Sequence, residues 1–151
     1  VVLRTQGAPG TAGAAALPRP IRCTCGPGRM PLGEWSRLGV LADYSGAIRY
    51  RRNFTAASAE LTGDIWLDLG TVAASAEVFL NGTSIGTLLA PPWQVRLSPH
   101  LRPGENTLEV QVCNTLANHY RCIPTRYRGD LTSGLLGPVR ITQHAQHAQH
   151  G

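Results

Sequence analysis

The sequence predicts an all-β protein, an antiparallel jelly-roll β-sandwich, because short runs of residues alternate between apolar and polar along most of the chain. Residues 65–69, 78–80 and 108–112 repeat with a period of two, which is typical of strands that bury one face. Asn81-Gly82 separates two such runs and predicts a hairpin, because both turn positions require positive φ. The 17 glycines and 11 prolines favour many turns and short strands over long helices.

The first half of the sandwich is expected to begin near Trp35. Residues 35–40 approach or begin the first core strand. Residues 44–54 alternate well enough to predict a strand, and its arginines are interpreted as a solvated face rather than as a site for an acidic ligand. Residues 56–63 form a loop or a single helical turn before the strand that starts at Ile65.

The second half is expected to contain the longest strand and the longest irregular segment. Residues 107–114 alternate without interruption after the Pro103-Gly104 turn. Residues 116–132 have no clear period and are rich in polar and aromatic side chains, and long irregular loops in compact domains tend to be functional. Residues 135–141 are predicted as the closing strand, with Gly137-Pro138 marking an edge position or a bulge.

The composition divides the chain into three parts. Residues 1–34 are rich in Gly, Pro and Ala and include a Cys-x-Cys pair, so they are expected to form an extended arm that buries little on its own. Residues 35–141 form the sandwich. Residues 142–151 contain an Ala-Gln-His repeat and are expected to be a short, polar C-terminal tail.

Four motifs of the central region occur in a familiar order. They read L-D-L-G, then A-E-V-F-L-N-G-T-S-I-G, then P-P-W-Q-V, then L-R-P-G-E-N-T-L-E-V-Q-V-C-N-T. In this order and spacing they resemble the galactose-binding-like β-sandwich that accompanies many glycoside hydrolases. The nearest resemblance is to the C-terminal accessory domain of α-L-rhamnosidase-like enzymes, over roughly residues 35–141.

The resemblance implies a carbohydrate-binding module without catalytic residues, because catalysis in such enzymes belongs to a separate, larger domain. A glycosidase requires two carboxyl groups that flank the scissile bond, whereas the nine acidic residues here fall mostly in turns or on outward strand positions. The chain also lacks the G-x-S-x-G, phosphate-loop and H-E-x-x-H motifs. It is therefore predicted to bind glycans or polysaccharide, to need no cofactor, and to be no enzyme by itself.

Sugar sites combine an aromatic plate with planar polar groups that bond to hydroxyls. The candidate carbohydrate-binding residues lie in turns and in the long irregular segment: Trp93, Asn118, Tyr120, Arg126 and Tyr127. A structural role is the alternative for each aromatic residue. Trp93 follows Pro91-Pro92 and could cap the core, and Tyr127 could serve either role.

Two features of the sequence favour a secreted, extracellular protein. The chain has four cysteines, Cys23, Cys25, Cys113 and Cys122, and an even number suits disulfide bonding. Pairing within the Cys-x-Cys segment is strained, which favours bridges from the arm to the sandwich, although a bridge between Cys113 and Cys122 stays open. Two N-glycosylation sequons begin at Asn53 and Asn81.

Several other partners are not expected. The net charge is +5, but the arginines are scattered and no nucleic-acid motif accompanies them. No apolar run approaches the ~20 residues of a membrane span. The cysteine spacing does not match structural zinc, and no cluster of loop acids suggests calcium. The tail histidines, His144, His147 and His150, are interpreted as part of a polar tail rather than as metal ligands.

A structural role is the alternative function. An arm from one subunit could pair with the open sheet edge of its neighbour, which would make the chain a subunit of an extracellular glycoprotein fibre or matrix. Self-assembly and attachment to a larger glycoside hydrolase chain are thus the two kinds of protein partner that the sequence suggests.

Overall fold

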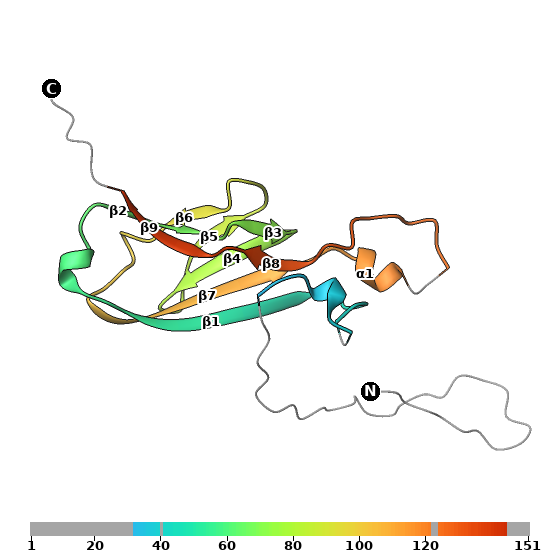
Figure 1. Ribbon diagram of the computed structural model, residues 1–151, viewed down its shortest axis with the longest axis horizontal. Helices are drawn as coiled ribbons and strands as arrows, with labels where there is room; N and C mark the ends of the chain where they lie inside the picture. Colours follow the sequence, from blue (N-terminus) through green and yellow to red (C-terminus); the bar gives the residue numbers. More distant parts are fainter. Residues whose placement is uncertain (1–31, 40, 122–123, 145–151) are drawn as a thin grey trace, which may run out of the picture. The chain divides into compact units, whose positions relative to one another are not determined.

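The computed structural model describes residues 32–39, 41–121 and 124–144, which form antiparallel sheets as the sequence predicts. Figure 1 shows their arrangement. The elements are η1 (Trp35–Arg37), β1 (Ala47–Ala56), η2 (Ser58–Glu60), β2 (Asp64–Asp68), β3 (Thr71–Ala73), β4 (Ser75–Leu80), β5 (Thr83–Leu88), β6 (Gln94–Arg96), β7 (Gly104–Cys113), α1 (Ala117–Tyr120), β8 (Gly134–Gly137) and β9 (Arg140–His144).

The largest sheet has four strands in the order β1-β7-β4-β5. The ten residues of β1 pair in register with β7, from Ala47 opposite Cys113 to Ala56 opposite Gly104. The alternation read from the sequence decides which face is buried, since Val110 and Val112 are buried while their neighbours Glu109 and Gln111 are half-buried.

A second layer consists of the three-stranded sheet β6-β2-β9 and the pair β3-β8. In Figure 1, β2, β6 and β9 lie above the layer that contains β1 and β7. Leu67 on β2 and Val78 on β4 are fully buried in the core. The two layers approach closely at Gly86 of β5, where a Cβ atom would lie 2.9 Å from Val95 Cγ2 of β6, so a larger residue there would force the Val95 side chain to shift.

The hairpin predicted at Asn81-Gly82 is confirmed. β4 and β5 pair antiparallel around it, and φ is +52° at Asn81 and +83° at Gly82. Positive φ at both positions matches the right-handed twist of the strands. The predicted strands over 44–54 and 107–114 are also present, as β1 and β7.

The segment expected to approach or begin the first core strand, residues 35–40, is not a strand over residues 35–39, the part that the structure describes. Trp35 begins the short 3-10 helix η1 and is fully buried, and its indole Nε1 donates a 2.6 Å hydrogen bond to the hydroxyl of Tyr50. Its backbone N–H donates to the carbonyl of Ser133 at 2.8 Å. The large buried ring of Trp35 and these two hydrogen bonds hold η1 in place without any sheet pairing.

The predicted closing strand over 135–141 is divided in two. β8 pairs with β3, whereas β9 pairs with β2. Gly137, with φ +73°, and Pro138, which has no N–H to donate, interrupt the segment between them. β9 continues to His144, three residues beyond the boundary expected for the sandwich, because residues 140–144 pair along all of β2. β3 was not predicted, since three residues are too few to show a period.

Candidate carbohydrate-binding site

A network of two buried side chains, Asn118 and Ser133, and the half-buried Asn114 holds the irregular segment after β7. Asn118 and Ser133 are fully buried. The hydroxyl of Ser133 donates to Asn118 Oδ1 at 2.9 Å, and Asn114 Nδ2 donates to the Ser133 hydroxyl at 3.0 Å. Asn118 Nδ2 donates to the carbonyl of Leu131 at 2.9 Å. Because buried amides need such partners, the network fixes both ends of the loop.

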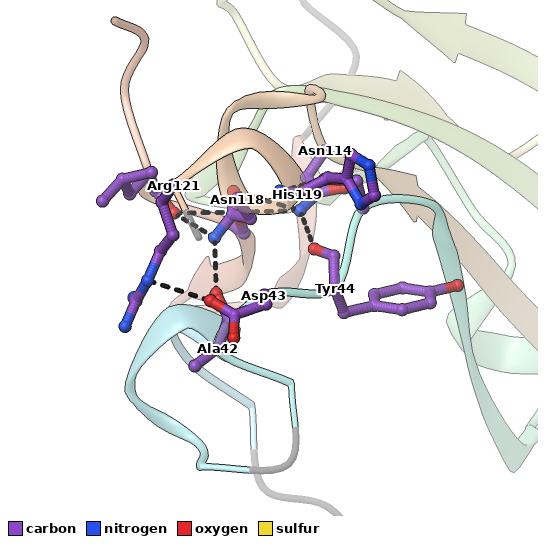
Figure 2. Close-up of polar contacts among 10 residues, drawn as sticks. Ala42, Asp43, Tyr44, Asn114, Asn118, His119 and Arg121 are labelled. Carbon is purple, nitrogen blue, oxygen red and sulfur yellow. Dashed lines mark hydrogen bonds and ion pairs between the residues drawn. The ribbon is translucent and has the colours of Figure 1, made fainter. Parts of the chain in front are cut away.

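The same amides attach this loop to the chain before β1, as Figure 2 shows. Asn114 Nδ2 donates to the carbonyl of Tyr44 at 2.8 Å, and the Gly46 N–H donates to Asn114 Oδ1 at 2.8 Å. Asn118 Nδ2 reaches the carbonyl of Ala42 at 3.3 Å. The loop and the entry to β1 therefore form one unit at this end of the sandwich.

Two further contacts join α1 to the same entry segment. The backbone N–H of His119 donates to the hydroxyl of Ser45 at 3.0 Å. Arg121 Nε lies 2.9 Å from Asp43 Oδ1, and both side chains are exposed. Figure 2 shows this ion pair beside the bond from Asn118 to Ala42. Such an exposed pair contributes little to stability, so it serves chiefly to orient the end of α1.

Three aromatic rings follow one another at this end. The ring centroids of His119 and Tyr120 are 5.3 Å apart, and those of Tyr120 and Tyr127 are 5.5 Å apart. Tyr127 is 46% exposed, whereas Tyr120 is half-buried. At Gly129, a Cβ atom would lie 3.0 Å from the Tyr127 hydroxyl, so a small residue is needed beside this ring. We call His119, Tyr120 and Tyr127 the ring cluster.

The charged side chains of the loop are differently engaged. Arg128 Nη1 donates to the carbonyls of Thr125 and Tyr127, at 2.7 and 2.8 Å, which tightens the turn that carries Tyr127. Arg126 is exposed. Hydrogen bonds from the backbone N–H and the side chain of Thr132 stabilise the ionised form of Asp130 and lower the pKa of its carboxyl below the ordinary value.

The predicted carbohydrate-binding residues do not all meet. Tyr120 and Tyr127 are in ring contact, and Arg126 is next to Tyr127 in the chain. Asn118 is buried, and its amide is used by the fold, so a direct contact from Asn118 to a sugar does not fit the structure. Trp93 is half-buried in the connection between β5 and β6, where its carbonyl accepts a hydrogen bond from the Leu69 N–H at 2.8 Å.

The amide network was missed in the sequence. Asn114 directly follows β7 and Ser133 directly precedes β8, so polar residues at the two limits of an irregular segment were the available signal. Among the described residues, every buried side-chain nitrogen or oxygen has a hydrogen-bond partner. The amides of Asn114 and Asn118 therefore hold the loop in place.

The predicted modification sites lie elsewhere. Asn53 is exposed on β1. Asn81 is half-buried in its hairpin, where its amide nitrogen donates to Asn106 Oδ1 at 2.9 Å and its oxygen accepts from the Thr107 N–H at 3.0 Å. These bonds would compete with a glycan at Asn81. Glycosylation of either residue stays a prediction.

Cys113 ends β7 and is half-buried. The other three cysteines, Cys23, Cys25 and Cys122, lie outside the described residues, as do the repeat histidines His147 and His150 and nearly all of the predicted arm. Disulfide pairing therefore stays a prediction. Within residues 32–39, 41–121 and 124–144, no three His, Cys, Asp or Glu side chains gather in a way that could hold a metal ion. The same residues contain no helix that is long and apolar enough to span a membrane.

These features define a two-layered antiparallel β domain with a fixed loop at one end. The family model "Glycosyl hydrolase 2 galactose-binding domain-like" matches residues 44–128, more than half of the chain. The chain therefore belongs to this family of galactose-binding-like accessory domains of glycoside hydrolases, in agreement with the resemblance read from the sequence.

Individual relatives are consistent with this family. A rhamnosidase from Novosphingobium sp. PP1Y superposes with a TM-score of 0.63 and 31% identity, over 73% of this chain and 12% of that one. A "Putative beta-glucuronidase" of Formosa agariphila is 39% identical over 77 residues, 50% of this chain and 7% of that one. A β-D-mannosidase from Dictyoglomus thermophilum shares the fold, with a TM-score of 0.54 and 21% identity over 78% of this chain.

The chain is short beside these relatives, since it spans 12% of the rhamnosidase and 7% of the curated protein. The part matched by the family model is a galactose-binding-like domain. The similarity thus concerns an accessory domain of much longer glycoside hydrolases.

Proposed function

We propose that the chain is a secreted, non-catalytic carbohydrate-binding module that works as the accessory domain of a larger glycoside hydrolase. The ring cluster is the binding surface. A sugar ring stacks on Tyr127 beside Tyr120, and the exposed guanidinium of Arg126 bonds to its hydroxyl groups. Trp93 stays a candidate for a separate contact, because it lies on the connection between β5 and β6.

The observation that carries this proposal is the fixed position of an exposed aromatic ring. Tyr127 is 46% exposed, and its ring centroid lies 5.5 Å from that of Tyr120. Preorganised rings lose little conformational entropy when a ligand binds. The bonds from Arg128 to its neighbouring carbonyls and the buried amide of Asn118 on α1 supply this preorganisation.

The rhamnosidase and β-glucuronidase relatives suggest which sugars to try. Rhamnose-, glucuronic-acid- and mannose-containing oligosaccharides are titrated into the protein, and binding is followed by ligand-observed NMR and calorimetry. Tyr127→Ala should weaken binding about tenfold, because one stacked ring is worth roughly 1–1.5 kcal/mol. Its melting temperature should stay close to that of the wild type.

Leu116→Ala is the matched control, because Leu116 is 58% exposed at the start of the same helix and should not contact the sugar. Equal binding by the wild type and Tyr127→Ala would refute the ring cluster as the site. A large fall in melting temperature for Tyr127→Ala would instead assign that ring to the structure of the loop.

Secretion is part of the same proposal and has its own test. The even number of cysteines and the exposed sequon asparagine Asn53 support it. Expression of the chain in a secretory host, followed by a non-reducing peptide map and glycan mass analysis, should reveal disulfides and a glycan at Asn53. Four reduced cysteines and an unmodified Asn53 would contradict it. Assembly into fibres stays a prediction, because the arm that it requires lies outside the described residues.

A further inference from the structure

The outer face of the sheet β6-β2-β9 carries a tryptophan at its centre. Along β2, Ile65 and Leu67 are buried, whereas Asp64, Trp66 and Asp68 are half-buried and point to the other face. Tryptophan is highly buried on average but rarely buried completely, because its ring is large. Part of the Trp66 ring stays accessible on the outward face of this antiparallel sheet.

Polar side chains surround this indole on the neighbouring strands. The register places the following residues opposite β2: Arg96 and Thr142 opposite Trp66, Gln94 and Arg140 opposite Asp68, and His144 opposite Asp64. Opposed residues of an antiparallel pair point to the same face. Trp66 is thus framed on both sides by side chains that can donate or accept hydrogen bonds.

Cross-strand bonds hold several of these groups in place. Arg96 Nη2 contacts Asp64 Oδ1. Gln94 Nε2 donates to Asp68 Oδ2 at 3.1 Å, and the Gly70 N–H donates to Asp68 Oδ1 at 2.7 Å. The polar groups around the indole are therefore oriented before any ligand arrives, which lowers the entropic cost of binding.

The opposite outer face of the sandwich provides a contrast. Its half-buried aromatic residue is Phe79 on β4, and the guanidinium of Arg49 lies 4.9 Å from the Phe79 ring centroid. That ring is covered by a cation from its own fold. At Trp66 the nearest arginine across the sheet, Arg96, directs its guanidinium to a carboxylate instead.

The charges of the Trp66 face balance. Two carboxylates, Asp64 and Asp68, are matched by two guanidiniums, Arg96 and Arg140, all placed by the sheet register. A balanced surface gives no net attraction to an anion or a cation. It is suited to a neutral ligand that has an apolar ring face and many hydroxyl groups.

We propose that this face is a second carbohydrate site, in which a neutral pyranose unit of a glycan stacks on Trp66. Gln94, Thr142 and Arg140 bond to its hydroxyls from the strands on either side. The site uses rigid sheet positions and none of the residues of the ring cluster, so it stands whether or not the ring cluster binds sugar.

The test uses the complete chain and two neutral probes, a manno-oligosaccharide and a galacto-oligosaccharide, with binding measured by calorimetry and by tryptophan fluorescence. Trp35 is fully buried, and a Trp93→Phe background removes the signal of the other half-buried indole. We expect at least one probe to change the fluorescence of this background. Addition of Trp66→Ala should weaken binding about tenfold, as expected for the loss of one stacked ring.

Matched variants separate this site from a loss of folding and from the ring cluster. Phe79→Ala removes the aromatic ring of the other outer face and should leave the affinity unchanged. Gln94→Ala alters an exposed side chain, should keep the melting temperature, and should weaken binding about threefold, the effect of one lost hydrogen bond. Tyr127→Ala should leave the Trp66 fluorescence response intact.

The proposal is overturned if neither probe changes the fluorescence or releases heat. It is also overturned if Gln94→Ala and Trp66→Ala both bind as the background does, or if Tyr127→Ala removes the fluorescence response. If Trp66→Ala does not fold, Gln94→Ala together with Arg140→Ala decides, because both side chains are exposed.

Discussion

The sheets and the loop of residues 114–133 are held together by different forces, although they belong to one domain. In the sheets, alternate side chains enter the core, and the backbone N–H and C=O groups form hydrogen bonds between paired strands, as in the ten-residue register between β1 and β7. In the loop, side-chain hydrogen bonds take the place of strand pairing. The side chains of Asn114, Asn118 and Ser133 bond to one another and to backbone carbonyls.

The difference separates the two surfaces that are proposed to bind sugar. Trp66 lies on a surface whose geometry is set by strand pairing. Tyr127 lies on a surface whose geometry depends on the buried amide of Asn118 and on ring contact with Tyr120. We therefore expect a single substitution in the loop to change the geometry of the whole loop, whereas a single substitution on a sheet surface should change only its immediate surroundings.

The largest effect should come from Gly134, the first residue of β8 directly after the loop, in comparison with Gly82 in a hairpin of the sheets. At Gly134, φ is +122° and a Cβ atom would lie 2.4 Å from the Gly33 carbonyl oxygen and 2.8 Å from Trp35 Nε1. Gly134→Ala should cost about 4 kcal/mol in the free energy of unfolding, from backbone strain and overpacking together. Chemical denaturation measures this loss of unfolding free energy.

The control is Gly82→Ala in the β4–β5 hairpin. Gly82 has positive φ, but open space surrounds the position of the added Cβ atom, so this substitution should cost only about 1 kcal/mol. Equal costs would show that packing around Gly134 is unimportant.

An intermediate effect should follow loss of the central amide. Asn118→Ala removes the bonds to Ser133, Leu131 and Ala42 and leaves buried groups without partners, so it should lower the free energy of unfolding by about 2–3 kcal/mol. Hydrogen exchange should increase in residues 114–133 before it increases in the sheets. The sheet control is Gln111→Ala, which loses a 2.8 Å hydrogen bond from the exposed side chain of Arg49 and should cost no more than about 0.5 kcal/mol. Unchanged exchange in the loop would argue against the network as its anchor.

The smallest expected effect concerns the pKa of an exposed carboxyl group in the loop. Asp130 is fully exposed, and its pKa is lowered by hydrogen bonds from Thr132. Because the folded pKa lies below the unfolded one, its stabilising contribution is present above the unfolded pKa and is lost as the pH falls through the folded pKa. A carboxyl-detected NMR titration should show Asp130 ionising at lower pH than an ordinary aspartate, and Thr132→Ala should reverse part of the shift. No difference between wild type and Thr132→Ala would leave the backbone N–H as the whole cause.

Much of the fold could be predicted, because strand periodicity and turn chemistry are local properties. The alternation in β2, β4 and β7 and the Asn81-Gly82 hairpin follow from residues that are close in sequence. The closing segment was predicted incorrectly as one strand. Its division into two strands depends on distant partners, since β8 pairs with β3 and β9 pairs with β2. Trp35 was expected near a strand, whereas its contacts with the distant residues Tyr50 and Ser133 hold it in a 3-10 turn.

The candidate sites were predicted less completely. The ring pair of Tyr120 and Tyr127 was among the residues named from the irregular segment, and the two rings do meet. Asn118 was named for the same site, but its burial reassigns it to the fold. A residue's polarity does not reveal whether it faces solvent or a buried carbonyl, so composition could not separate these roles.

The sequence by itself determined the all-β architecture and the hairpin, because both depend on short-range patterns of side-chain polarity and turn residues, and the order of its motifs resembled the family that the family model then matched. Only the tertiary structure decided how the loop is attached and what surrounds Trp66. The amide of Asn114 bonds to Tyr44 across 70 residues of sequence, and the surroundings of Trp66 come from two strands that pair with β2. Such contacts depend on the relative positions of distant segments, which no local pattern encodes.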